Sequence, residues 1–171
     1  EQEIINLFYN KFQEIPLLSR MGEVMEYFAD AWETLRGRDL SEDEKEYLSG
    51  KFMKMYVTRD VYKIYNCFLE EMGYPMLPNV PYEKRKLQYE DVFPMLYLKY
   101  RLEGGKKHKQ IKHLVIDEMQ DYSYLQYVIL SYLFSCKMTI LGDKAQTIDT
   151  VERDVLTFLP KILGKDIRKI V

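Results

Sequence analysis

The chain has 171 residues and a formal net charge of −2. That length allows one compact domain or two small lobes, and the near balance of acids and bases gives no support for a globally basic nucleic-acid binder. Cys67 and Cys136 lie far apart in apolar helical patterns, which favours buried free thiols over a metal site. No run approaches the ~18 apolar residues of a membrane span, and there is no signal peptide. We therefore expect a cytoplasmic protein without membrane contact. Its start without Met and its end in an apolar run suggest an excised fragment.

Apolar residues recur at helical spacing up to about Tyr74. A first helix is expected around Ile4 to Phe12. Ser41 and Glu44 form a capping box for a later helix, and Thr58 is expected to cap the next one, which Gly73 and Pro75 end. We predict an all-helical lobe over residues 1–74. The second helix carries an apolar stripe that we expect to pack inward: Val24, Tyr27, Phe28, Ala31, Trp32 and Leu35.

Three prolines between Tyr74 and Pro81 indicate a lobe boundary. The predicted plan is a helical lobe over residues 1–74, a linker over 75–90 and an α/β domain over 91–171. A helix is predicted over Asp91 to Glu103, where Pro94 is tolerable only in the first turn. A basic tract follows, and two readings of it stay open: a solvated loop before a buried strand, or a contact with nucleic-acid phosphates. Its cations, against the one acid Glu103, are Lys99, Arg101, Lys106, Lys107, Lys109 and Lys112.

The pattern changes at His113. Two short runs rich in β-branched residues, His113 to Ile116 and Lys137 to Leu141, predict strands, and Ile167 to Val171 is a candidate start of a third. Helical patterns follow each strand, over Tyr124 to Phe134 and about Val151 to Leu163. Strand alternating with helix is typical of a parallel sheet with covering helices. Functional residues are then expected just after Ile116 and Leu141, beyond the carboxyl ends of the strands.

Two adjacent acids, Asp117 and Glu118, come directly after the first predicted strand. Crowded carboxylates repel each other unless a cation or a proton relieves the repulsion. One of the pair can address Mg²⁺ bound with a nucleotide, while the other takes the proton from an attacking water. The competing reading is that the acids cap the next helix.

Gly142, Asp143 and Gln146 follow the second predicted strand. Glycine permits a tight exit from the strand, and the amide of Gln146 can both donate and accept hydrogen bonds. Such an amide suits a sensor of a terminal phosphate and its attacking water. An ordinary turn is the competing reading of this segment taken alone.

The run LVIDEMQD, followed about twenty-five residues later by ILGDKAQTI, resembles motifs II and III of the UvrD/Rep-type superfamily 1 helicases. The resemblance covers roughly residues 111 to 150, and the helical region before it is compatible with that family's helical insertion. It implies an α/β fold, part of a RecA-like P-loop NTPase parallel sheet. The implied function is an ATP-dependent helicase or translocase that moves along single-stranded or partly duplex DNA.

The resemblance also implies residue roles. Asp117 would bind Mg²⁺, Glu118 would be the general base, and Gln146 would contact the γ-phosphate of ATP. Gln120, Asp121 and Asp143 would be supporting polar residues at the nucleotide.

Two departures from the family pattern affect these expectations. No aromatic residue follows Ile148, where the family carries one that stacks on DNA bases, and this divergence suggests the HelD-like branch, which acts on RNA polymerase. The phosphate-binding loop GxxxxGK[ST] is absent, so the chain alone is expected to be inactive and the complete parent to be the ATP hydrolase. The alternative is a non-enzymatic interaction domain that retains a degenerate motor core.

Overall fold

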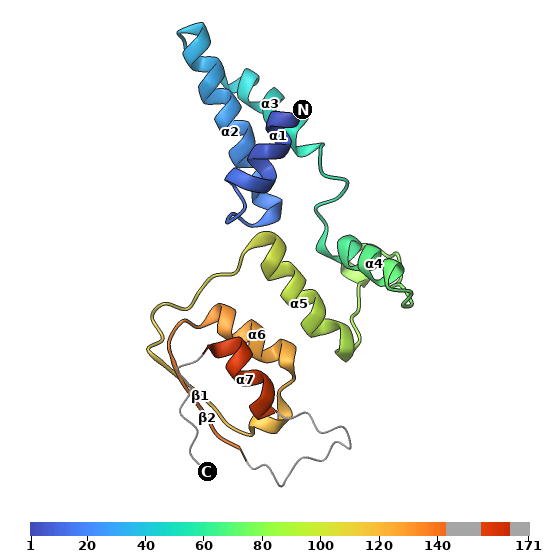
Figure 1. Ribbon diagram of the computed structural model, residues 1–171. Coiled ribbons are helices and arrows are strands. Elements are labelled where there is room, and N and C mark those ends of the chain that lie inside the picture. The colour runs from blue at the N-terminus through green and yellow to red at the C-terminus, as the bar shows by residue number, and fades with distance from the viewer. Residues whose placement is uncertain (143–154, 165–171) are drawn as a thin grey trace. The chain divides into compact units, whose positions relative to one another are not determined.

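The computed structural model describes residues 1–142 and 155–164 (Figure 1). Its contacts divide the chain into two compact units, Glu1–Gly104 and Gly105–Val171. The sequence pattern placed the change of lobe earlier, at residues 75–90. The helix that follows this segment packs with the helices before it, which is why the division by contacts falls at Gly104.

The first unit is helical throughout. Helix α1 (Gln2–Asn6) continues directly into a π-helical turn over Leu7–Lys11, and a short 3₁₀ turn lies at Tyr82–Lys84. Its other helices are α2 (Leu17–Arg36), α3 (Glu42–Met53), α4 (Val61–Glu71) and α5 (Tyr89–Glu103).

The core of the N-terminal helices is smaller than the sequence pattern predicted. Val24 of α2 is fully buried and packs with Leu7, Phe8, Met21 and Phe52. Further along the same predicted stripe, Trp32 is 43% exposed and Leu35 is 83% exposed. The prediction that the whole stripe packs inward is therefore wrong for its C-terminal half.

Helix ends follow the predicted capping chemistry with one correction. At α3, Ser41 Oγ accepts from Glu44 N and Glu44 Oε2 accepts from Ser41 N, so the capping box is confirmed. At α4 the N-cap is Asp60, whose carboxylate accepts from Tyr62 N at 3.0 Å, and the prediction of Thr58 is wrong. The Asp60 carboxylate also binds Arg85, 25 residues away, through two hydrogen bonds of 2.9 and 2.5 Å.

Helix α5 begins at Tyr89, two residues before the predicted start, so Pro94 lies inside the helix and beyond its first turn. A proline there lacks the N–H that would bond the carbonyl of Glu90. The helix packs against α2 and α4, and Tyr65 of α4 donates to Asp91 Oδ1 at 2.8 Å. Gly104 ends α5 with a φ of 80°, a region that favours glycine.

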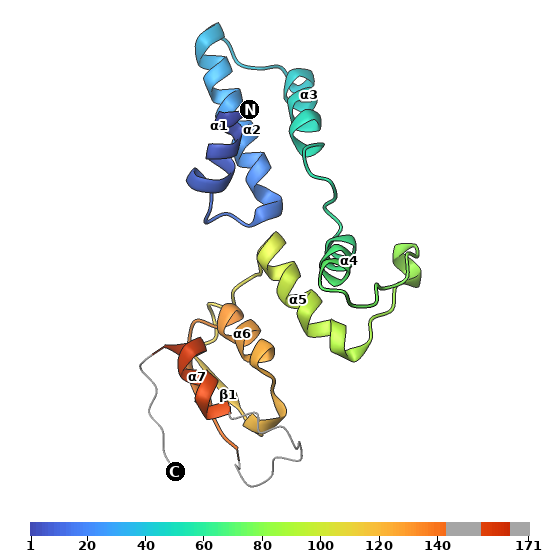
Figure 2. The same cartoon turned by 45° about the vertical axis from the view of Figure 1, so that its right-hand side comes forward.

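The second unit is built on two parallel strands, β1 (His113–Ile116) and β2 (Lys137–Ile140). Helix α6 (Tyr124–Leu133) connects them, and α7 (Val155–Leu163) follows (Figure 2). The register pairs His113 with Lys137 and Ile116 with Ile140. Both predicted strands, their parallel pairing and the helix between them are confirmed. The third predicted strand, Ile167 to Val171, lies outside the described residues.

Helices α6 and α7 pack on one face of this sheet. Ile116 and Tyr127 form its core with Val155 and Leu159 of α7. The two thiols are free, as predicted, but Cys67 is exposed and Cys136 is half-buried, so their expected burial is wrong. Of the helices in the described residues, none is both long and apolar enough to cross a membrane.

Candidate functional site

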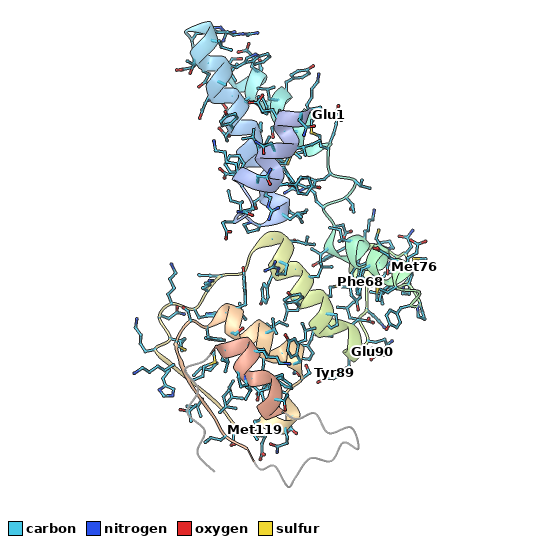
Figure 3. The ribbon with its side chains drawn as sticks, viewed as in Figure 1. Glu1, Phe68, Met76, Tyr89, Glu90 and Met119 are labelled. Carbon is cyan, nitrogen blue, oxygen red and sulfur yellow. The ribbon has the colours of Figure 1, made fainter. Side chains whose placement is uncertain are left out.

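The segments that follow β1 and β2 run side by side beyond the strands. The main chain of Leu141 donates to Ile116 O at 2.8 Å, and Met119 N donates to Leu141 O at 2.8 Å. The loop after β1 is thus held against the exit of β2 by main-chain hydrogen bonds. Asp117 and Glu118 are exposed at this carboxyl end of the strands, where the sequence pattern predicted functional residues. Met119, which follows them in the chain, is labelled in Figure 3.

Glu118 has an unusual backbone conformation. Its φ of 51° and ψ of 57° are left-handed, and it is the one non-glycine residue with a positive φ among the described residues. The Asp117 carboxylate accepts from Glu118 N at 2.9 Å, and Glu118 O accepts from Asp121 N at 2.9 Å. Left-handed backbone costs a residue with a side chain roughly 1–2 kcal/mol, and such strain is concentrated at functional sites.

Gln120 fixes the side chain of Glu118. Its amide Nε2 donates to Glu118 Oε2 at 2.7 Å. Its Oε1 is buried and has no hydrogen-bond partner among the described residues, which is uncommon for a buried acceptor. The Glu118 carboxylate is consequently held in one orientation while remaining open to solvent.

The competing reading, in which the acids cap the next helix, does not describe α6. Ser123 is its N-cap, with Oγ accepting from Gln126 N at 3.3 Å and Gln126 Oε1 accepting from Ser123 N at 2.7 Å. Asp117 and Glu118 have no capping role at α6, and Asp121 is exposed before it. The element that directly follows the acids is a 3₁₀ turn over Met119–Asp121, which has Glu118 at its N-cap position without a side-chain cap hydrogen bond. Capping of α6 therefore does not account for the acids.

Tyr127 of α6 stabilises the loop that follows β1. It is 1% exposed, and its hydroxyl donates to Met119 O at 3.0 Å. Burial, together with the neighbouring Tyr122, raises the pKa of the Tyr127 phenol to about 12. The sequence analysis did not identify Tyr127 as part of the site. Its position on the apolar face of α6 was the available signal, and this signal does not distinguish it from an ordinary core residue.

Gly142 has a clear spatial requirement. A Cβ atom at this position would lie 2.4 Å from Met119 Cγ, 2.7 Å from Gln120 Oε1 and 2.8 Å from Met119 N. The sequence analysis attributed this glycine to a tight exit from the strand. The structure gives a more specific reason, since only glycine lets the exit of β2 lie against the loop after β1.

The structure brings together Asp117, Glu118, Gln120 and Gly142. Asp143 and Gln146, the other predicted site residues, lie outside the described residues, and their roles stay predictions. Within residues 1–142 and 155–164, no three His, Cys, Asp or Glu side chains are grouped so as to hold a metal ion by themselves.

Comparison with known protein families gives one match. A model of the UvrD/REP helicase N-terminal domain matches residues 25–149, a span that includes the segments after both strands. No curated protein matches the chain. Because the family match covers well over half of the sequence, the chain belongs to the UvrD/Rep helicase family.

Proposed function

We propose that this chain supplies the Mg²⁺-binding, catalytic-base and γ-phosphate-sensing residues of an ATP-dependent DNA helicase or translocase. In this proposal β1 and β2 are neighbouring strands of a RecA-like sheet. The observation that carries the proposal is the close contact between Gly142 and the loop after β1, in which a single added carbon would lie 2.4 Å from Met119. This contact supports a composite site, because it holds the segments after two parallel strands at one sheet edge.

Glu118 is the proposed general base. A general base must present an ionised carboxylate to the attacking water in a fixed direction. Gln120 donates a 2.7 Å hydrogen bond to this carboxylate, and this bond limits the rotation of the carboxylate. We therefore propose Gln120 as the residue that positions the base, and Glu118 as the residue that accepts the proton.

Asp117 is the proposed ligand of Mg²⁺, either directly or through water. Its side chain is exposed at the strand end and its carboxylate oxygens are donors of the type that Mg²⁺ prefers. Nucleotide-associated Mg²⁺ is usually held by one or two carboxylates together with phosphate oxygens, so Asp117 can serve without a cluster of three acids. When bound, Mg²⁺ neutralises charge on the phosphates of ATP. Asp117 also caps Glu118 N, and so fixes the backbone that presents the base.

Gln146 is proposed to contact the γ-phosphate, with Asp121 and Asp143 as supporting polar residues. The proposal for Gln146 and Asp143 rests on sequence, since they follow Gly142 in the segment that leaves β2. Family membership supports DNA as the substrate. A partnership with RNA polymerase stays a prediction of the sequence alone.

The test is Glu118→Gln in a complete helicase motor that carries these residues. Loss of a positioned base should reduce ATP turnover by roughly 10²–10⁴-fold while ATP binding is retained. Glu46→Gln, an exposed position on α3, is the matched control and should leave turnover unchanged. Near-normal turnover of the Glu118 variant would mean that the base lies elsewhere.

A second measurement uses the 171-residue chain itself. Backbone N–H groups and a lysine of a GxxxxGK[ST] loop normally grip the triphosphate, and this sequence contains no such loop. Calorimetric titration with Mg-ATP should therefore detect no tight binding. Micromolar affinity would show that the chain contains a phosphate-gripping element of its own, most plausibly in the segment from Gly104 to Lys109.

A further inference from the structure

Acidic and basic side chains separate to opposite ends of the β1–β2 sheet. In the described part of the second unit, the acids are Asp117, Glu118 and Asp121, all beyond the carboxyl end of β1. Among the described residues, the charged side chains at the amino-terminal end of the strands are all cationic. We call this end the lysine end, and it comprises Lys106, Lys107, Lys109, Lys112 and Lys137.

Register and topology place these lysines together. Lys112 immediately precedes β1, and Lys137 is the first residue of β2 and neighbours it through the pairing with His113. Helix α6 returns the chain from the carboxyl end of β1 to the start of β2, so its last residues lie at the same end. The segment with Lys106, Lys107 and Lys109 is attached to those residues.

Specific contacts hold that segment on the end of α6. Gly105 N donates to the Tyr132 hydroxyl at 3.1 Å, and His108 N donates to Leu133 O at 2.9 Å. The His108 ring stacks on Phe134 with centroids 5.0 Å apart. The lysines therefore project from an anchored segment rather than from a free tail.

Ordinary structural roles account for only part of this charge. Lys107 lies over the Tyr132 ring at 5.6 Å, and a cation near the C-terminus of α6 offsets the helix dipole by about 0.3–1 kcal/mol. One or two lysines would suffice for both effects. All five side chains are exposed, and within the described residues none of the five forms an ion pair with a carboxylate.

The acids at the carboxyl end of the strands do little to reduce the positive potential at the lysine end. Four residues of strand span about 13 Å at 3.3 Å per residue. The Debye length at physiological ionic strength is about 8 Å, so Asp117 and Glu118 are largely screened from the lysine end. A polyanion that approaches this end meets a local cationic surface on a chain whose net charge is negative.

We propose that the lysine end binds the phosphate backbone of single-stranded DNA, at a site separate from the nucleotide site. The choice of DNA as the polyanion rests on the proposed function, whereas the surface itself follows from the positions of the lysines. Lysine is a flexible point charge that contacts phosphate without reading sequence. Three to five such contacts predict a log–log salt dependence of affinity with a slope of roughly −2 to −3.5 for a single strand.

The test measures fluorescence anisotropy of a labelled oligothymidylate of about 20 nucleotides, titrated with the 171-residue chain at several salt concentrations. The wild-type chain should bind with a salt-dependent Kd on the order of 10⁻⁵ M at low salt. The variant with Lys106, Lys107, Lys109 and Lys112 all replaced by alanine should bind at least tenfold more weakly, with a slope near −0.7 or below in magnitude. Arginine at the same four positions should retain the affinity.

The matched control removes four exposed lysines from the first unit, with the same change in net charge: Lys54, Lys63, Lys84 and Lys86 to alanine. This control should keep wild-type affinity, and circular dichroism should show native helix content in every variant. Equal loss in the control, absence of salt-dependent binding by the wild-type chain, or at least tenfold preference for duplex over single-stranded DNA would each overturn the proposal. Glu46→Gln, which also removes one negative charge, should leave DNA affinity unchanged. DNA affinity is measured without ATP, whereas the proposed catalytic site is tested by ATP turnover, so failure of the lysine end is distinguishable from failure of that site.

Discussion

Alanine at Gly142 would introduce a carbon atom where the structure has no room for one. The added Cβ would lie 2.4 Å from Met119 Cγ, which a side-chain movement can relieve, and 2.8 Å from Met119 N, which only a backbone movement can relieve. That same N–H donates to Leu141 O, so the relief must weaken the bond between the two loops. Overpacking of this kind costs about 1–3 kcal/mol. Alanine also lowers the conformational entropy of the unfolded chain, which stabilises the folded state by roughly 0.4–1 kcal/mol. The free energy of unfolding of Gly142→Ala should therefore fall by about 1–2 kcal/mol.

Amide hydrogen exchange followed by NMR measures this loss where it occurs. The amides of Met119 and Leu141 should exchange roughly 5- to 30-fold faster in Gly142→Ala than in the wild-type chain. Gly50→Ala is the matched control, because a Cβ at that position in α3 would meet nothing within 4 Å. It should stabilise α3 by about 0.5–1 kcal/mol. Unchanged or slower exchange at Met119 in Gly142→Ala would refute the inference that the two loops need this glycine.

Two further variants test the loop support and the helical unit. Tyr127→Phe removes the hydrogen bond to Met119 O and should cost about 1 kcal/mol in thermal or urea denaturation. Burial raises the pKa of Tyr127 to about 12, so the wild-type stability from this group is complete below pH ~10 and is lost as pH rises toward 12, a loss that the Phe variant should not show. At Glu44, the hydrogen bond from Arg38 lowers the pKa to about 2. Its stabilising effect should be complete above pH ~4.5 and lost as pH falls toward 2. The melting temperature of Glu44→Gln should therefore depend less on pH over this range than that of Glu46→Gln. Equal pH dependence of the two variants would contradict the lowered pKa of Glu44.

The sequence predicts the second unit better than the first, for physical reasons. His113 to Ile116 and Lys137 to Ile140 are short β-branched runs with a helical pattern between them, and few other folds suit that order. In the first unit, Asp60 and not Thr58 caps α4, and its carboxylate also binds Arg85, a partner distant in sequence that no local pattern reveals. Pro94 lies inside α5 because the helix begins at Tyr89, two residues before the predicted start, and α5 packs against α2 and α4, which local propensity does not contain.

In the candidate site too, the predictions rest on local sequence signals, whereas contacts between distant segments were not predicted. Asp117 and Glu118 were predicted because their residue types and their position after the strand suit the chemistry, and Gln120 was predicted from the resemblance to the UvrD/Rep motif. The left-handed backbone of Glu118, its hydrogen bond from Gln120 and the support from Tyr127 were not predicted. These features depend on how the loop meets the exit of β2 and the first turns of α6, and only the folded arrangement determines them.

The left-handed conformation of Glu118 has a consequence for engineering. Glycine adopts this backbone without the roughly 1–2 kcal/mol penalty that a side chain incurs, so a selection for thermal stability alone would favour glycine at position 118. Under the proposed function, that substitution removes the base. The optimum for stability and the optimum for turnover therefore call for different residues at one backbone position. Stabilising libraries for this protein should keep residue 118 fixed and seek their gains elsewhere, for instance at Gly50.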